Sequence, residues 1–103
     1  MRPLIVIGNW KMNGSLASNQ DWMKSVAQGM ESGMPAGRKF VVCPPFPYLQ
    51  QCGKLIKEYS IAFLSLGAQD VSAQPSGAYT GETGANMLSE IGCQYVIVGH
   101  SER

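Results

Sequence analysis

The sequence predicts an α/β protein in which parallel strands alternate with helices. Two patterns indicate this fold class: four short apolar runs rich in β-branched and aromatic residues, and segments between them with apolar residues at helical spacing. The apolar runs are nearly continuous, which is typical of strands covered on both faces in a parallel sheet. The resulting order, βαβαβαβ, is compatible with a doubly wound sheet or with a (β/α) barrel.

Each predicted strand ends at a residue that disfavours its continuation. The four runs are LIVIGNW from Leu4, FVVCPPF from Phe40, IAFLSLGAQ from Ile61 and QYVIVGH from Gln94. Glycine, asparagine or proline closes each run after about five residues, a usual strand length. The sequence therefore predicts four parallel strands.

Three predicted helices, at residues 18–30, 47–59 and 82–92, lie between the strands. Ser18 or Asn19 is expected to cap the first helix, Gly92 is expected to end the third, and a further helix is expected to begin at Ser101. The expected apolar faces are Trp22, Met23, Val26, Ala27 and Met30 in the first helix, Leu49, Cys52, Leu55, Ile56 and Tyr59 in the second, and Ala85, Leu88 and Ile91 in the third.

The composition is that of an ordinary globular protein. The chain has 103 residues, 45% of them hydrophobic and 15% charged, with a net charge of +1. This balance predicts neither a nucleic-acid partner nor attraction to a membrane, and no apolar stretch is long enough to span a bilayer or serve as a secretory signal. We therefore expect a cytoplasmic protein. The spacing of Cys43, Cys52 and Cys93 matches no metal site, so we expect these cysteines to be structural.

One glycine-rich segment, SGAYTGETGANM at residues 76–87, could in principle hold a phosphate. Its glycines, Gly77, Gly81 and Gly84, match neither the dinucleotide-binding nor the P-loop pattern, and the segment follows a long loop instead of the first strand. This mismatch disfavours a nucleotide-binding domain. We also expect no metal site.

Polar residues lie at the ends of the first and fourth predicted strands. Asn9 and Lys11 lie at the end of the first strand, and His100, the one histidine, lies at the end of the fourth. Because parallel strands end at one edge of a sheet, these side chains are expected at the same rim.

Their chemistry suits a carbonyl substrate. The N-terminus of the helix predicted at Ser101 would disfavour imidazolium, so a neutral His100 could donate a hydrogen bond to a carbonyl oxygen. Lys11 could stabilise negative charge on that oxygen, an effect worth roughly 3–4 kcal/mol in a dry site. Taken singly, each has an ordinary interpretation: a structural histidine, a solvated lysine and, for Asn9, a turn former.

Four segments resemble the triosephosphate isomerase family. These are GNWKMNG at residues 8–14, CPPFPYL at 43–49, GAQDVSAQPSGAYTGETGANML at 67–88 and VIVGHSER at 96–103, in the family's order and spacing. The resemblance implies part of an eight-stranded (β/α) barrel. It also implies an isomerase of glycolysis and gluconeogenesis that interconverts dihydroxyacetone phosphate and glyceraldehyde 3-phosphate through an enediol(ate), without cofactor.

The resemblance assigns roles to four residues at the rim. Asn9 and Lys11 match the family's substrate-contacting pair, and Lys11 stabilises charge there. His100 matches the residue that polarises the substrate carbonyl and moves protons between its oxygens. Glu102 matches a supporting carboxylate near the lysine.

The resemblance also implies a homodimer. The loop at residues 69–84 is similar to one that enters a second subunit, where Thr80 would approach the partner's active site. Glu82 and Arg103 would form an ion pair across the subunits.

A complete barrel of this kind has about 250 residues. Residues 1–103 are therefore expected to be the amino-terminal part of a single barrel domain, without the catalytic base, the closing lid and the later phosphate-binding loops. Alone, this part is expected to be inactive and, because its outer strands lack neighbours, to self-associate or stay partly molten. The alternative is a half-barrel module that assembles with itself and has no catalytic role.

Overall fold

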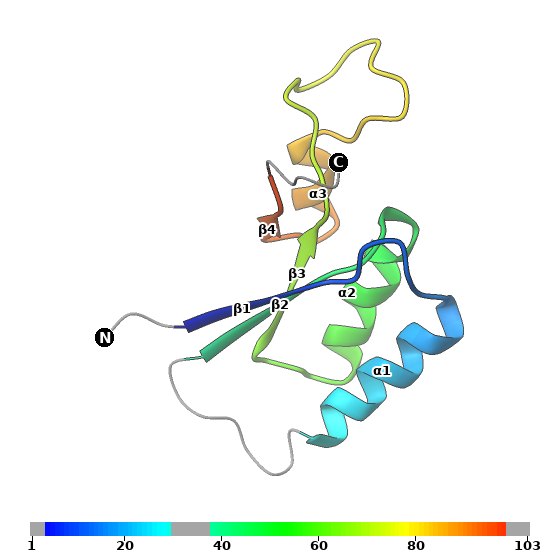
Figure 1. The fold of residues 1–103 in the computed structure, drawn as a ribbon, viewed down its shortest axis with the longest axis vertical. Helices are drawn as coiled ribbons and strands as arrows, with labels where there is room; N and C mark the ends of the chain where they lie inside the picture. The colour runs from blue at the N-terminus through cyan, green and yellow to red at the C-terminus, as the bar shows by residue number, and fades with distance from the viewer. Residues whose placement is uncertain (1–3, 30–37, 99–103) are drawn as a thin grey trace.

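The computed structural model describes residues 4–29 and 38–98 of the chain (Figure 1). Strands and helices alternate along the chain, as the sequence predicts. The elements are β1 Leu4–Asn9, α1 Leu16–Gly29, β2 Arg38–Cys43, the 3₁₀ turn η2 Phe46–Tyr48, α2 Leu49–Glu58, β3 Leu64–Ala68, α3 Ala85–Glu90 and β4 Tyr95–Val96. Within these ranges no helix is both long enough and apolar enough to span a membrane.

The four strands form one parallel sheet in the order β1-β2-β3-β4. β1 and β2 pair over their full lengths, from Leu4 opposite Arg38 to Asn9 opposite Cys43. β2 and β3 pair over a shorter stretch, and β4 joins β3 through two residue pairs. Sequential parallel strands with helical connections confirm the predicted partial (β/α) barrel architecture.

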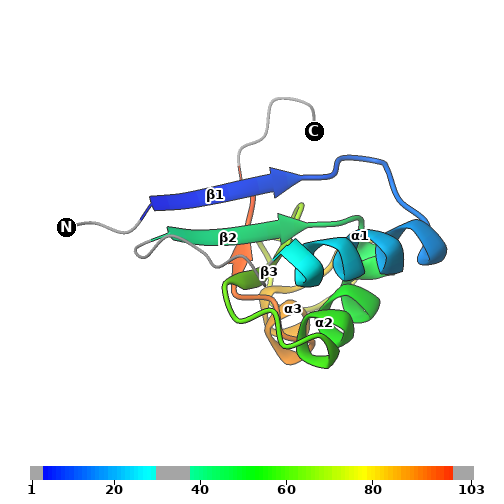
Figure 2. The same cartoon turned by 90° about the horizontal axis from the view of Figure 1, so that it is seen from below.

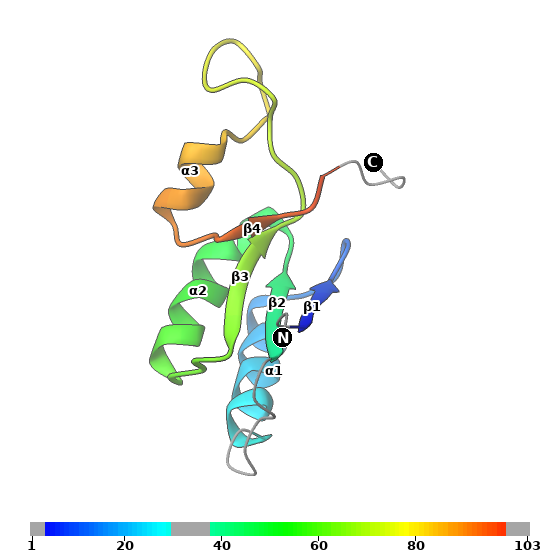
Figure 3. The same ribbon diagram turned by 90° about the vertical axis from the view of Figure 1, so that its left-hand side faces the viewer.

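The main core lies between the sheet and the two long helices. Figures 2 and 3 show α1 and α2 side by side on one side of the strands. Apolar side chains of both helices meet those of β2 and β3 in this layer, and α3 adds one more. The buried members are Met23, Val42, Leu49, Cys52, Leu55, Ile61, Leu64, Leu66, Ala68 and Leu88. The predicted apolar face of α2 is thus confirmed.

β1 differs from the expectation of a strand covered on both faces. Its four apolar side chains, from Leu4 to Ile7, are 41–54% exposed, whereas the side chains of β3 are buried. In the described part of the chain, β2 is the one strand that pairs with β1. A strand gains cover from its neighbours, so β1 keeps one edge and much of its apolar surface open.

The start of α1 also differs from the prediction. The helix begins at Leu16, and the hydroxyl Oγ of Ser15 accepts a hydrogen bond from the Ser18 N–H at 3.0 Å. Ser15 is therefore the capping residue, in place of Ser18 or Asn19. Asn19 is only 1% exposed because its side chain bonds Ser15 and, on α2, Gln51.

α3 is shorter than the predicted segment. It spans Ala85–Glu90, and of its expected apolar face only Leu88 is buried, while Ala85 is exposed and Ile91 is 39% exposed. Gly92 ends the helix as predicted, with φ +96°.

α2 and α3 end in the same hydrogen-bonded motif with different residues at the left-handed position. After α3, Gly92 N–H donates to Ser89 O and Cys93 N–H to Leu88 O. After α2, Ser60 N–H donates to Lys57 O and Ile61 N–H to Ile56 O, so Ser60 occupies the position of Gly92 with φ +52°. Both ends are Schellman motifs, in which glycine is favoured because it has no Cβ.

Replacing Ser60 with glycine should stabilise the protein. Ser60→Gly removes the steric cost of a left-handed serine and is expected to raise the free energy of unfolding by up to about 1 kcal/mol. Gly92→Ala is the matched control and should lower it by about the same amount. Chemical denaturation measures both changes, and a destabilising Ser60→Gly would contradict this account.

Candidate functional site

The candidate site is the edge of the sheet where β1, β2 and β3 end. Asn9 is the last residue of β1, Cys43 of β2 and Ala68 of β3. The parallel pairing places all three carboxyl ends at this edge, and the chain continues from each of them into a connecting segment (Figure 1). Such rims hold the reactive groups of (β/α) barrels.

Lys11 stands in this rim with an unusual backbone. Its φ is +55°, in the left-handed region that residues with a Cβ rarely adopt. The Lys11 N–H donates to the side-chain oxygen Oδ1 of Asn9 at 2.9 Å, and the Lys11 carbonyl accepts from Nε2 of Gln69 at 2.7 Å. Both sides of this residue are thus held by polar side chains, while Lys11 itself is exposed.

The bond from Lys11 to Asn9 is an Asx turn, in which a side chain bonds the backbone two residues ahead. The interpretation of Asn9 as a turn former is therefore confirmed by this contact. A role for Asn9 towards substrate stays a prediction.

Trp10 fastens the beginning of the loop to the body of the protein. Its N–H donates to the Cys43 carbonyl at 3.1 Å, and its own carbonyl accepts from Nδ2 of Asn13 at 2.9 Å. Its ring meets the ring of Trp22 on α1 edge to face, with centroids 5.3 Å apart. The loop after β1 is thus anchored to both β2 and α1.

The far end of the same loop is fixed at Gly14. The Tyr48 hydroxyl donates to the Gly14 carbonyl at 3.3 Å. Gly14 has φ +128°, and a Cβ there would lie 2.9 Å from Oδ1 of Asn19. A pair of side-chain amides supports this end: the buried Asn19 donates through Nδ2 to Oε1 of the half-buried Gln51 at 2.9 Å, and Gln51 Nε2 donates to the Leu16 carbonyl at 2.7 Å.

The cysteine at the rim is poorly suited to nucleophilic chemistry. Burial, with a smaller contribution from Cys93, raises the pKa of the Cys43 thiol to about 11. Burial raises the pKa of Cys52 to about 11 and also raises that of Cys93. These thiols stay protonated near neutral pH, as expected of structural cysteines. Cys43 and Cys52 are buried and Cys93 is half-buried, and all three are free thiols.

His100, Glu102 and Arg103 lie outside the described residues, as do Met30 and the helix predicted at Ser101. β4 runs parallel to β3, so its carboxyl end faces the same rim, and Ile97 N–H donates to the Ala68 carbonyl at 2.9 Å. The meeting of His100 with Lys11 remains a prediction.

Thr80 and Glu82 are exposed in the loop between β3 and α3. This loop, residues 69–84, projects away from the sheet and helices (Figures 1 and 3). Its base is closed by a hydrogen bond from Ser72 N–H to Thr83 O at 2.8 Å, and Tyr79 is 44% exposed near its tip. The structure therefore presents both residues on a protruding surface and places neither with Asn9 or Lys11.

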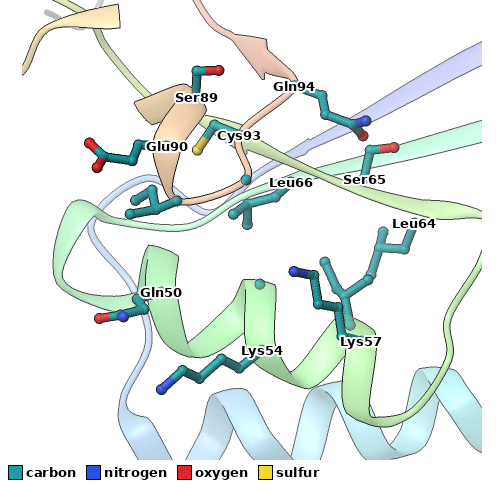
Figure 4. Close-up of a pocket in the computed structure, with 14 residues that line it drawn as sticks. Gln50, Lys54, Lys57, Leu64, Ser65, Leu66, Ser89, Glu90, Cys93 and Gln94 are labelled. Carbon is teal, nitrogen blue, oxygen red and sulfur yellow. The ribbon is translucent and has the colours of Figure 1, made fainter. Parts of the chain in front are cut away.

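A pocket lies away from the rim, between α2, β3 and the end of α3 (Figure 4). Its volume is about 640 Å³, and it contains none of the predicted site residues. Lys54, Lys57 and Glu90 line it together with apolar side chains such as Leu66. Its charges have both signs, and no group of three potential metal ligands occurs anywhere in residues 4–29 and 38–98.

Gln69 is not among the site residues predicted from the sequence, where it is only the first residue of a long loop. It directly follows β3, as Asn9 ends β1, so the same argument from strand ends could have identified it. Gln69 bonds to both Lys11 and Cys43 and so touches all three strand ends of the rim.

Comparison with known proteins agrees with this architecture. The family model described as triosephosphate isomerase matches residues 4–103. Across the whole chain, the sequence is 82% identical to a triosephosphate isomerase of Polynucleobacter asymbioticus, 78% to one of Polynucleobacter necessarius and 52% to one of Cupriavidus taiwanensis. The chain spans about two fifths of the length of these relatives, namely 41%, 41% and 39%.

The family match thus covers every strand and helix of the described chain, together with the loop that holds Lys11. The chain belongs to the triosephosphate isomerase family.

Proposed function

We propose that the protein interconverts dihydroxyacetone phosphate and D-glyceraldehyde 3-phosphate through an enediol(ate), without cofactor, as a triosephosphate isomerase of glycolysis and gluconeogenesis. The observation that carries the proposal is the constrained Lys11 at the rim, within the segment GNWKMNG of a chain that matches the family. A lysine held out of its preferred backbone conformation at a strand end is typical of functional sites.

In the proposed reaction, Lys11 supplies fixed positive charge. Its ammonium stabilises the negative charge of the phosphorylated substrate and the charge that develops on the substrate oxygens. Asn9 lies beside it and fixes its N–H. The backbone of Lys11 is thus held by Asn9 before substrate arrives.

His100 completes this arrangement in the proposal. As a neutral imidazole it donates a hydrogen bond to the substrate carbonyl while the carbon-bound proton is removed, and it then moves protons between the two oxygens. Glu102 supports Lys11 as a nearby carboxylate. Removal of the carbon-bound proton requires a base, and none of the seven acidic residues of this chain stands at the family's position for it.

We also propose a cytoplasmic homodimer. The protruding loop at residues 69–84, with Thr80 and Glu82 exposed, offers a surface that a second subunit could cover. Thr80 would approach the partner's site, and Glu82 would pair with Arg103 across the interface. Three free cysteines suit a reducing compartment.

For residues 1–103 alone, a second proposal follows from the exposed strand β1. Apolar side chains that are 41–54% exposed along an open strand edge favour association with another chain. We propose that the isolated segment self-associates and has no isomerase activity of its own.

The first test is a Lys11 substitution in the full-length protein. Lys11→Met keeps an unbranched side chain one atom shorter but removes its charge, and it should lower kcat/KM by about 10²–10³-fold. Lys24→Met, on the exposed surface of α1, is the matched control and should leave kcat/KM unchanged. A coupled isomerase assay measures both. Wild-type protein without isomerase activity would refute the proposed function.

The second test uses residues 1–103 expressed alone. Sedimentation velocity should show oligomers or aggregates, and the coupled assay should detect no turnover, because loss of the general base alone costs about 10²–10⁴-fold. A compact monomer that unfolds cooperatively would overturn the proposal of self-association. Recovery of activity on adding the rest of the barrel would show that the segment still docks.

A further inference from the structure

We infer that Gln69 is a positioning residue that holds Lys11 in its functional conformation. The inference rests on the proposed function, because it assumes that the Lys11 ammonium binds the anionic substrate. It adds the residue that follows β3 to a site predicted from the ends of the first and fourth strands.

One side-chain nitrogen of Gln69 makes both of the contacts that support this inference. Nε2 of Gln69 donates to the Lys11 carbonyl at 2.7 Å and to the Cys43 carbonyl at 2.9 Å. Gln69 follows the last residue of β3, so this nitrogen links the end of β3 to the loop after β1 and to the end of β2. Gln69 is half-buried, and its bond to the Cys43 carbonyl is part-buried.

The chemistry of this contact selects glutamine. A primary amide has two N–H groups on one nitrogen, and here two carbonyls accept from that nitrogen. Glutamate of the same shape offers acceptors, so its ionised form would repel both carbonyls. Methionine has a similar length and no donor, and asparagine is one methylene shorter.

The position of the bond matters as much as its chemistry. Lys11 is held at φ +55°, and both of its own backbone polar groups are bonded: its N–H donates to Asn9, and its carbonyl accepts from Gln69. Backbone angles decide the direction in which a side chain leaves its Cα. Loss of the Gln69 bond frees the carbonyl and lets Lys11 move to a commoner backbone conformation, which changes the direction of its side chain.

A purely structural role makes a different prediction. If Gln69 only fastened the three strands together, its loss would lower stability and the fraction of active protein. The affinity of the remaining folded protein for an anion would not change. An inhibition constant does not depend on the active fraction, so it separates the two roles.

The experiment compares Gln69→Met with wild type in the full-length protein. We expect KM and the inhibition constant for inorganic phosphate to rise together by fivefold or more, with kcat/KM at least tenfold lower. Lys11→Met should give the same pattern. Gln28→Met, exposed on α1, is the matched control and should change neither constant. An unchanged phosphate inhibition constant in folded Gln69→Met would overturn the inference, even if stability falls.

A second variant and a second readout keep the outcomes distinct. If Gln69→Met does not fold, Gln69→Glu takes its place, and its phosphate affinity should improve as pH falls and the carboxyl becomes a donor. No such improvement, or wild-type affinity near neutral pH, would overturn the inference. If wild-type protein shows no isomerase activity, the proposed function fails, and direct titration with phosphate still decides whether Gln69 affects the Lys11 site.

Discussion

The parallel register of β1, β2 and β3 is the constraint on which the candidate site depends. Asn9 lies opposite Cys43, and β3 ends beside them, so three separate loops leave the sheet at one edge. Segments that are far apart in the sequence thereby come within hydrogen-bonding distance. Antiparallel pairing of the same strands would place their carboxyl ends at opposite edges.

Hydrogen bonds from side chains, more than strand pairing, hold the loop that follows β1. Asn9, Gln69, Asn13 and Tyr48 each bond the backbone of the loop that follows β1. The bond between the Asn19 and Gln51 amides and the Ser15 cap continue the network into α1. This density of polar contacts can hold Lys11 at a positive φ, because an unfavourable backbone angle persists only where its surroundings determine it.

The two outer strands of the described chain are less well covered or less extensively paired than β2 and β3. β1 leaves apolar side chains exposed, whereas the layer between β2, β3 and the long helices is buried. β4 joins the sheet through only two residue pairs. The buried core therefore lies between β2, β3, α1 and α2, and the outer strands extend the sheet on either side of it.

The sequence by itself determined the order of elements, the parallel class and the buried face of α2, because β-branched runs and helical spacing are local patterns. It also identified Asn9 and Lys11 as strand-end residues, and the Gly92 stop. The predicted cap of α1, Ser18 or Asn19, was wrong, because Ser15 caps the helix. Asn19 is instead buried by its tertiary contact with Gln51. Only the tertiary structure revealed the role of Gln69. Its partners, Lys11 and Cys43, lie 58 and 26 positions away, and no local pattern records a hydrogen bond that sheet pairing creates.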